Sequence, residues 1–164
     1  MHHRLHVDFC KKGAVCAVVI IPFHRKVQYY ETDMMGIAHH ANYIHWMEEA
    51  RIDFMDQIGF PYSKMEAMNI FSPVKSLSCN YRKPCTFGDE LEIALSVSAF
   101  NGVVMVISYQ MKNARTGETV CATQSEHCFL DRDGHFVRLK KALPLFCDKA
   151  EALLADHRER NADE

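Results

Sequence analysis

The stretch YYETDMMGIAHHANYIHWMEEAR, residues 29–51, contains the change of hydrophobic period that decides the fold. β-branched and aromatic residues from Val18 to Tyr30, which lead into this stretch, predict a strand. The strand-like run continues past Asp33 and stops at Gly36. From Asn42 to Ile58 apolar residues recur every three or four positions, which predicts an amphipathic helix. An acid, a glycine and two adjacent histidines therefore occupy the few residues between a strand and a helix.

The predicted helix carries an apolar stripe that a neighbouring layer must cover. The stripe consists of Tyr43, Met47, Ala50, Phe54 and Ile58. Gly59 followed by Pro61 ends the helix, and residues 62–69 add a short second one. A further helix is predicted from Pro144 to about Arg158, with Phe146, Ala150, Leu153 and Leu154 on one side.

Residues 72–130 have the pattern of antiparallel strands joined by tight turns. Apolar residues alternate with polar or small ones from Leu91 to Ala99, and Asn101-Gly102 and residues 131–134 form turns. The run from Val103 to Met111 is apolar on both faces, so we expect both to be covered. The prediction is an α+β fold, a curved antiparallel sheet wrapped around one long central helix, with an extra C-terminal helix. The strand order does not follow from this pattern.

The chain of 164 residues is expected to form one domain, residues 18–141, with a poorly packed extension at 1–17 and a C-terminal helix and tail at 142–164. The beginning of the sequence imitates a signal peptide. Its apolar run is too short to span a bilayer and no small-residue cleavage site follows, so we favour an extension over a retained export signal.

Charge and cysteine usage exclude several classes of protein. A net charge of -2 gives no overall basic field, so neither nucleic acid nor a membrane surface is an expected partner. Seven scattered cysteines without a CxxC pair predict buried free thiols and a cytoplasmic protein. The adjacent histidines lack the i, i+4 spacing of helical metal ligands, so we expect no metal and no cofactor.

The junction before the helix has the groups that acyl transfer to water requires. Backbone N–H groups near His40 begin a helix, where they lack intrahelical partners and can stabilise a developing oxyanion. Gly36 leaves room for a substrate carbonyl, and Asp33 can present a carboxylate to it. The alternative interpretation of Asp33 is an ordinary cap or loop acid.

This block resembles the signature of hot-dog-fold acyl-CoA thioesterases of the 4-hydroxybenzoyl-CoA thioesterase type, including the YbgC-like enzymes. The resemblance covers roughly residues 23–140. Its specific part is Tyr29 to Asp33, Gly36, His40 to Tyr43, Trp46 and Glu49 to Arg51, and its looser part includes Pro73-Val74, Tyr81, Pro84, Phe87 to Asp89, Gly102, Gly117-Glu118 and His127.

The resemblance implies a hot-dog fold, hydrolysis of acyl-CoA thioesters and a role for each matching residue. It implies that Asp33 is the catalytic acid, as nucleophile or as general base, and that the His40 amide forms the oxyanion hole. It also implies that Gly36, Asn42 and Tyr43 contact the substrate, whereas His39 receives no chemical role. Relatives place the active site between subunits, which implies a homodimer or a homotetramer.

CoA carries several phosphate charges, so a slightly acidic protein needs a local basic rim to bind it. Arg82 and Lys83 are the candidates for this rim, with the basic residues at 138–141 as a second cluster; both could also be ordinary surface charge. Met34 or Met35 could line an acyl pocket or belong to the core.

Two alternative functions stay open. One is a hot-dog hydratase or dehydratase acting on acyl-CoA or acyl carrier protein, and the other is a non-enzymatic acyl-CoA-binding protein.

Overall fold

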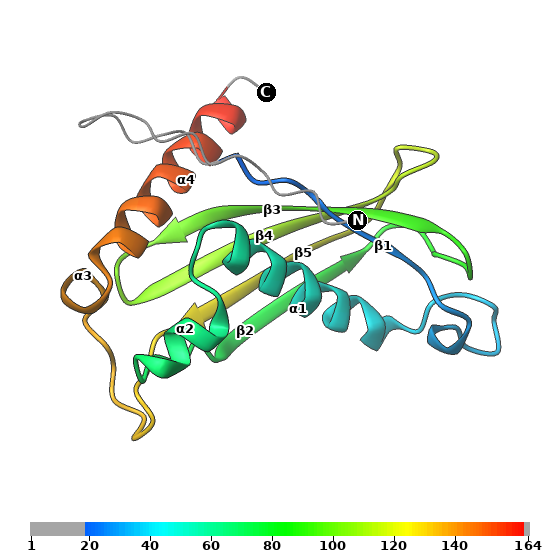
Figure 1. Cartoon of the computed structure of the whole chain (residues 1–164). Helices are drawn as coiled ribbons and strands as arrows, with labels where there is room; N and C mark the ends of the chain where they lie inside the picture. Colours follow the sequence, from blue (N-terminus) through cyan, green and yellow to red (C-terminus); the bar gives the residue numbers. More distant parts are fainter. Residues whose placement is uncertain (1–18, 163–164) are drawn as a thin grey trace, which may run out of the picture.

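Five antiparallel strands form one sheet in the order β1-β3-β4-β5-β2 (Figure 1). The computed structural model describes residues 19–162, so the extension expected at 1–17 lies outside the described part of the chain. The expected meander is confirmed for three consecutive strands, whereas the strand that follows the helices crosses over to an edge beside the last one. The strands are β1 (Phe23–Lys26), β2 (Val74–Tyr81), β3 (Glu90–Phe100), β4 (Val104–Asn113) and β5 (Thr119–Cys128).

The long helix α1 (His40–Gln57) lies across one face of the sheet, which curves around it (Figure 1). All five residues of the predicted apolar stripe are buried, which confirms the central helix. Burial of one such side chain, for example Phe54, stabilises the fold by about 1.5–3 kcal/mol. Trp46 and Arg51 are buried as well, because both flanks of α1 also meet other elements.

The two faces of the sheet differ in burial. The alternation predicted for β3 is confirmed, since Leu91, Ile93 and Val97 are fully buried on the side of α1. On β4, however, only the inward residues are buried, and outward residues such as Val106 and Gln110 are half-buried or exposed. The prediction that both faces of residues 103–111 are covered is therefore wrong for the single chain, because both long helices lie on the inner face.

The C-terminal helix α4 (Pro144–Ala162) packs beside the end of α1, and its predicted apolar side is buried. Phe146 contacts three other phenylalanine rings, and Lys149 Nζ donates a hydrogen bond to the Ile58 carbonyl at 2.7 Å. The short helices α2 (Tyr62–Ala67) and α3 (Leu139–Ala142) lie before β2 and α4. Within residues 19–162, no helix is long and apolar enough to cross a membrane.

The first strand is much shorter than predicted. Instead of a strand from Val18 to Tyr30, β1 covers four residues, and Tyr29–Glu31 forms a 3-10 helix, η1. The carboxylate of Glu31 accepts the Gln28 backbone N–H at 2.7 Å, which stabilises the first turn of η1 in place of an extended chain. Asp33 therefore lies in a turn after η1 rather than inside a strand.

Candidate active site

Asp33 begins a tight turn, residues 33–37, that reverses the chain before α1. The Asp33 N–H donates to the Ile37 carbonyl at 2.9 Å, and the Gly36 N–H donates to the Asp33 carbonyl at 2.9 Å. Gly36 has φ +74°, a left-handed conformation that L side chains rarely adopt, and an added Cβ would meet no atom within 4 Å. The glycine is thus needed for the backbone conformation of the turn, which is a different reason from the one expected.

The N-terminus of α1 follows two residues after this turn. His39 is its N-cap, and the ring Nδ1 accepts a hydrogen bond from the Ala41 N–H at 3.3 Å, while the His39 carbonyl accepts the Asn42 N–H at 2.9 Å. Among the described residues, no group accepts a hydrogen bond from the N–H of His40. This amide is therefore free to bind an oxygen atom of a ligand, and the helix dipole favours negative charge there.

A cavity of about 410 Å³ lies at this junction, between the N-terminus of α1 and the end of β2. It brings together five of the seven residues predicted for the site, and leaves out Gly36 and Asn42. The Asn42 side chain instead donates to the Glu31 carbonyl at 2.7 Å. The wall consists of Asp33, Ile37, Ala38, His40, Tyr43, Tyr81, Arg82, Lys83 and Pro84.

The Asp33 carboxylate is partly engaged and partly free. Its Oδ1 accepts the Met35 backbone N–H at 2.8 Å, which fixes the orientation of the side chain. Within residues 19–162, Oδ2 has no hydrogen-bond or ion-pair partner. A half-buried carboxylate with one fixed and one free oxygen can act on a carbonyl carbon or on a water molecule in the cavity.

Two tyrosines contribute to the apolar part of the wall. The rings of Tyr43 and Tyr81 meet edge to face with centroids 5.1 Å apart, and the Tyr81 hydroxyl donates to the His40 carbonyl at 3.3 Å. Burial raises the pKa of Tyr43, so its hydroxyl stays neutral. Burial also raises the pKa of the neighbouring Cys85 thiol, which makes a thiolate nucleophile unfavourable there. The sequence pointed to Tyr81 only through the looser part of the resemblance.

Arg82 and Lys83 line the mouth of the cavity as exposed cations. Lys83 forms an ion pair with Glu118, whereas the Arg82 guanidinium has no ion-pair partner among the described residues. The second basic cluster expected, residues 138–141, lies around α3 at the other end of the sheet (Figure 1), where Lys140 pairs with Glu151 at 3.4 Å. Only the first cluster is placed to bind phosphate at this cavity.

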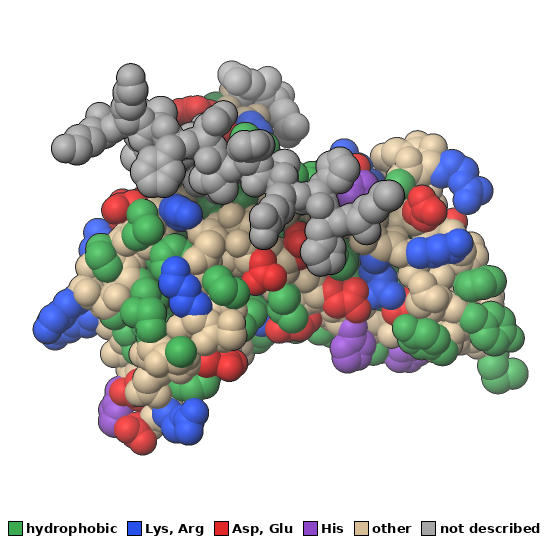
Figure 2. Space-filling view, viewed as in Figure 1, with side chains coloured by type: hydrophobic (Ala, Val, Ile, Leu, Met, Phe, Trp, Pro, Cys, Tyr) green, Lys and Arg blue, Asp and Glu red, His purple; other side chains and the backbone are tan. Residues whose placement is uncertain are grey.

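Exposed apolar side chains surround the turn that precedes α1. Figure 2 shows hydrophobic side chains gathered at the right-hand edge of the molecule, over this turn. Met34 and Met35 are almost fully exposed, and neither lines the cavity of the single chain. An apolar patch of this kind on a globular protein commonly marks an interaction surface. Its members are Tyr29, Tyr30, Met34, Met35 and Phe87.

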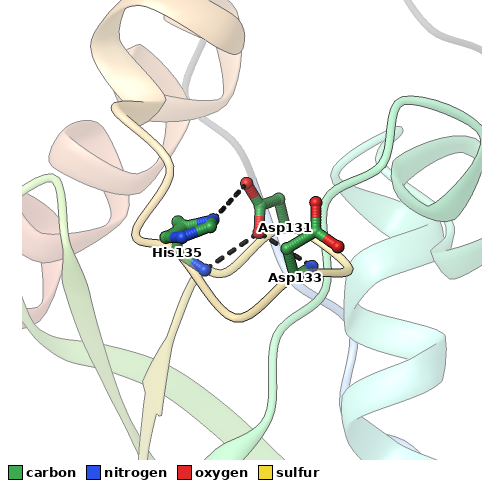
Figure 3. A group of neighbouring side chains, drawn as sticks. All are labelled: Asp131, Asp133 and His135. Carbon is green, nitrogen blue, oxygen red and sulfur yellow. Dashed lines mark hydrogen bonds and ion pairs between the residues drawn. The ribbon is translucent and has the colours of Figure 1, made fainter.

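One group of potential metal ligands, Asp131, Asp133 and His135, lies in the turn after β5 (Figure 3). Their ligand atoms lie within 4.8 Å of one another. Asp131 Oδ1, however, accepts the backbone N–H groups of Asp133 at 3.0 Å and His135 at 2.9 Å. The carboxylate thus organises its own turn, and the group shares no residue with the cavity.

The chain is similar to known proteins over most of its length. The family model described as "Thioesterase-like superfamily" matches residues 27–154. The protein named "Putative acyl-CoA thioesterase YneP" from Bacillus subtilis is 34% identical over 119 residues, which is 73% of this chain and 86% of YneP. "Long-chain acyl-CoA thioesterase FadM" from Escherichia coli is 27% identical, covering 78% of this chain and 92% of FadM. The crystal structure of DHNA-CoA thioesterase from Staphylococcus aureus is 29% identical, with a TM-score of 0.76, and covers 88% of this chain and 95% of that one.

Proposed function

The chain belongs to the thioesterase-like superfamily, with a hot-dog fold, and from this premise we propose that it hydrolyses acyl-CoA thioesters to a free acid and CoA. The observation that carries the proposal is that Asp33, with its free carboxylate oxygen, and His40, whose N–H has no acceptor among the described residues, line one cavity. A carboxylate and a helix N-terminal donor are the two groups that hydrolysis of a thioester needs most.

The reaction divides between these two groups. The thioester carbonyl oxygen accepts the His40 N–H, and the macrodipole of α1 adds to the stabilisation as the oxygen becomes negative. Oδ2 of Asp33 either attacks the carbonyl carbon or takes a proton from the attacking water. If Oδ2 attacks, the carbon–sulfur bond breaks to leave a mixed anhydride with Asp33, and water then hydrolyses this anhydride to the free acid and the regenerated carboxylate. If Asp33 acts as a base, the water itself adds to the carbonyl carbon before the carbon–sulfur bond breaks. In both routes CoA leaves as a thiolate that takes up a proton.

The rest of the cavity accounts for binding of the two halves of the substrate. Arg82 and Lys83 at its mouth bind phosphate oxygens of CoA, as cations of this kind do in water-exposed sites. Tyr43 and Tyr81 provide an apolar wall for the first atoms of the acyl group. The names of the similar proteins include an aromatic and a long-chain substrate, so the acyl preference is best found by assay.

We also propose that the protein assembles as a homodimer or a homotetramer. β2 is an edge strand, and one side of its backbone has no partner strand among the described residues. Val74, Leu77 and Tyr81 on this strand are exposed, as is the apolar patch beside the cavity. Edge strands and apolar patches are commonly covered by a second copy. The described cysteines are all free thiols, which supports a cytoplasmic location.

The test is release of free thiol from a panel of short-chain, long-chain and aromatic acyl-CoA substrates. We expect turnover on at least one of them, and a loss of at least about 10²-fold in Asp33→Asn, the magnitude typical of losing a catalytic group. Asp131→Asn, a matched change in a similar turn away from the cavity, should keep full turnover. Full activity of Asp33→Asn would remove Asp33 from the mechanism. Tight binding of CoA without any hydrolysis would favour an acyl-CoA-binding protein.

A further inference from the structure

We propose that Glu31 is a positioning residue, which fixes the Asp33 carboxylate relative to the His40 amide. The inference rests on the proposed function of these two groups. Glu31 does not line the cavity, yet it lies only two residues before Asp33, and through its main chain it bonds to the start of α1. Glu31 therefore connects the turn that carries Asp33 with the start of α1, which carries the His40 amide.

The side chain of Glu31 is a buried carboxylate with three donors. Oε1 accepts Arg25 Nη2 at 2.7 Å and the Trp46 indole N–H at 2.9 Å, and Oε2 accepts the Gln28 backbone N–H at 2.7 Å. These donors come from β1, from α1 and from the residue that caps η1. A buried carboxylate held from three directions by charge-assisted and neutral hydrogen bonds is fixed in one position.

The main chain of Glu31 holds the N-terminus of α1 directly. Its carbonyl oxygen accepts the His39 N–H at 2.8 Å and the Asn42 side-chain amide at 2.7 Å. His39 and Asn42 lie on either side of the segment that carries the free amide of His40. The side chain of Glu31 thus connects η1 to the sheet, and its carbonyl connects η1 to α1. A shift of Glu31 therefore changes the separation of Asp33 and His40.

Only an ionised carboxylate satisfies this arrangement, because every neighbour of Glu31 is a donor. In Glu31→Gln the volume is kept, but the side-chain NH₂ must face a donor N–H in either orientation. The guanidinium of Arg25 retains its second partner, Glu49 Oε2 at 2.8 Å, so the buried charge is not left alone. We therefore expect the variant to fold and the junction between η1 and α1 to shift. A displacement of about 1 Å can cost about 10²-fold in rate.

The first experiment compares Glu31→Gln with a buried control of similar chemistry. Ser125→Ala removes a hydroxyl that bonds to His127 Nε2 at 2.7 Å and to Tyr109 OH at 3.0 Å, away from the cavity. Both variants should unfold at a lower temperature than the wild type. At 25 °C, Glu31→Gln should lose at least about 10-fold in kcat with an unchanged KM, whereas Ser125→Ala should keep its kcat.

Asn42→Ala provides a second variant and separates positioning from substrate binding. Direct binding of substrate by Asn42, as the sequence led us to expect, would raise KM. Positioning through the Glu31 carbonyl lowers kcat and leaves KM unchanged. A rise in KM alone, or wild-type kcat in both Asn42→Ala and Glu31→Gln, would overturn the inference.

A double-mutant cycle with Asp33→Asn measures the loss of kcat caused by Glu31→Gln with and without Asp33. A general loss of stability would give the same loss in both backgrounds. If Glu31 acts by placing Asp33, Glu31→Gln should cost less than about 2-fold once Asp33 is replaced. The same loss in both backgrounds would mean that Glu31 acts independently of Asp33. Failure of the proposed function has a different result, namely full activity of Asp33→Asn or no thioester hydrolysis by the wild type.

Discussion

The turn at Asp33 and the turn at Asp131 have nearly the same backbone structure and different surroundings. In both, the aspartate N–H donates to the carbonyl four residues on at 2.9 Å, and the glycine N–H three residues on donates to the aspartate carbonyl, at 2.9 Å and 3.1 Å. Each carboxylate accepts the backbone N–H two residues on, at 2.8 Å and 3.0 Å. Gly36 and Gly134 have φ of +74° and +85°. The sequences DMMG and DRDG thus give one local geometry.

The two turns differ in the partners of Oδ2, the second oxygen of the aspartate carboxylate. Asp131 Oδ2 lies 3.5 Å from His135 Nδ1, and the backbone N–H of His135 lowers the pKa of this carboxyl below its ordinary value. Within residues 19–162, Oδ2 of Asp33 has no such partner, and Asp33 lines the same cavity as His40, the first residue of α1. The comparison teaches that the turn only orients an aspartate. On the proposed function, the element that follows the turn decides whether the aspartate has a structural or a catalytic role.

The largest effect that separates the two turns is expected from alanine at the two glycines. Neither glycine has an atom within 4 Å of an added Cβ, so the cost in each is the left-handed backbone, about 1–2 kcal/mol in the free energy of unfolding. Both Gly36→Ala and Gly134→Ala should therefore show a similar drop in Tm by calorimetry. Only Gly36→Ala should also lose turnover, by at least about 10-fold, because its turn orients Asp33. Equal turnover in the two variants would contradict the difference that we draw.

A smaller effect is expected from the arginines at the two sites. Arg82 is at the cavity mouth, whereas Arg132, in the other turn, lies over the Phe71 ring at 5.7 Å. Arg82→Ala should raise KM for acyl-CoA by about 3- to 5-fold, the scale of one exposed ion pair, and the effect should diminish with added salt. Arg132→Ala should leave KM unchanged. Initial rates at several salt concentrations would measure both, and a salt-independent rise in KM would exclude a phosphate contact.

The smallest effect concerns the pH dependence of stability at Asp131. Its pKa is lower in the folded protein than the ordinary value of 3.8, so the ionised carboxylate stabilises the folded state above that pH. This contribution is lost as the pH falls through the folded-state pKa. Asp131→Asn should therefore have a slightly lower Tm than the wild type at pH 7, and the difference should be smaller at pH 3, below the ordinary pKa. A constant difference at both pH values would show that the charge does not matter.

The sequence predicted one of the two turns and missed the other, for a physical reason. DRDG is polar throughout, and it was expected as a turn. DMMG follows two tyrosines and a threonine, which favour strands, so Asp33 was expected in a strand-like run. The structure of η1 depends on the Glu31 carboxylate, whose partners Arg25 and Trp46 are 6 and 15 residues away. Local preference does not include such contacts.

The fold could be predicted from hydrophobic periodicity, and the residues of the candidate site were proposed from the resemblance of residues 29–51 to a known family. The stripe of α1 and the alternation of β3 follow from burial on one face, so they could be read directly. The resemblance and the charge pattern predict Asp33, His40 and Arg82 as site residues, and all three line one cavity. The cap formed by His39 was missed because histidine is not among the usual N-cap residues. The crossing of β2 to the edge depends on long-range pairing, which no local pattern contains.

The edge position of β2 has a consequence for how the activity depends on protein concentration. Tyr81 ends this strand, and Arg82 and Lys83 follow it, so the strand with a single neighbour carries one wall of the cavity. A strand bonded on one side opens at a lower free energy than one bonded on both. Pairing with a second copy would hold that wall in place. If the proposed dimer forms through this edge, specific activity should fall on dilution, because separation of the subunits would remove the support of the wall that holds the thioester.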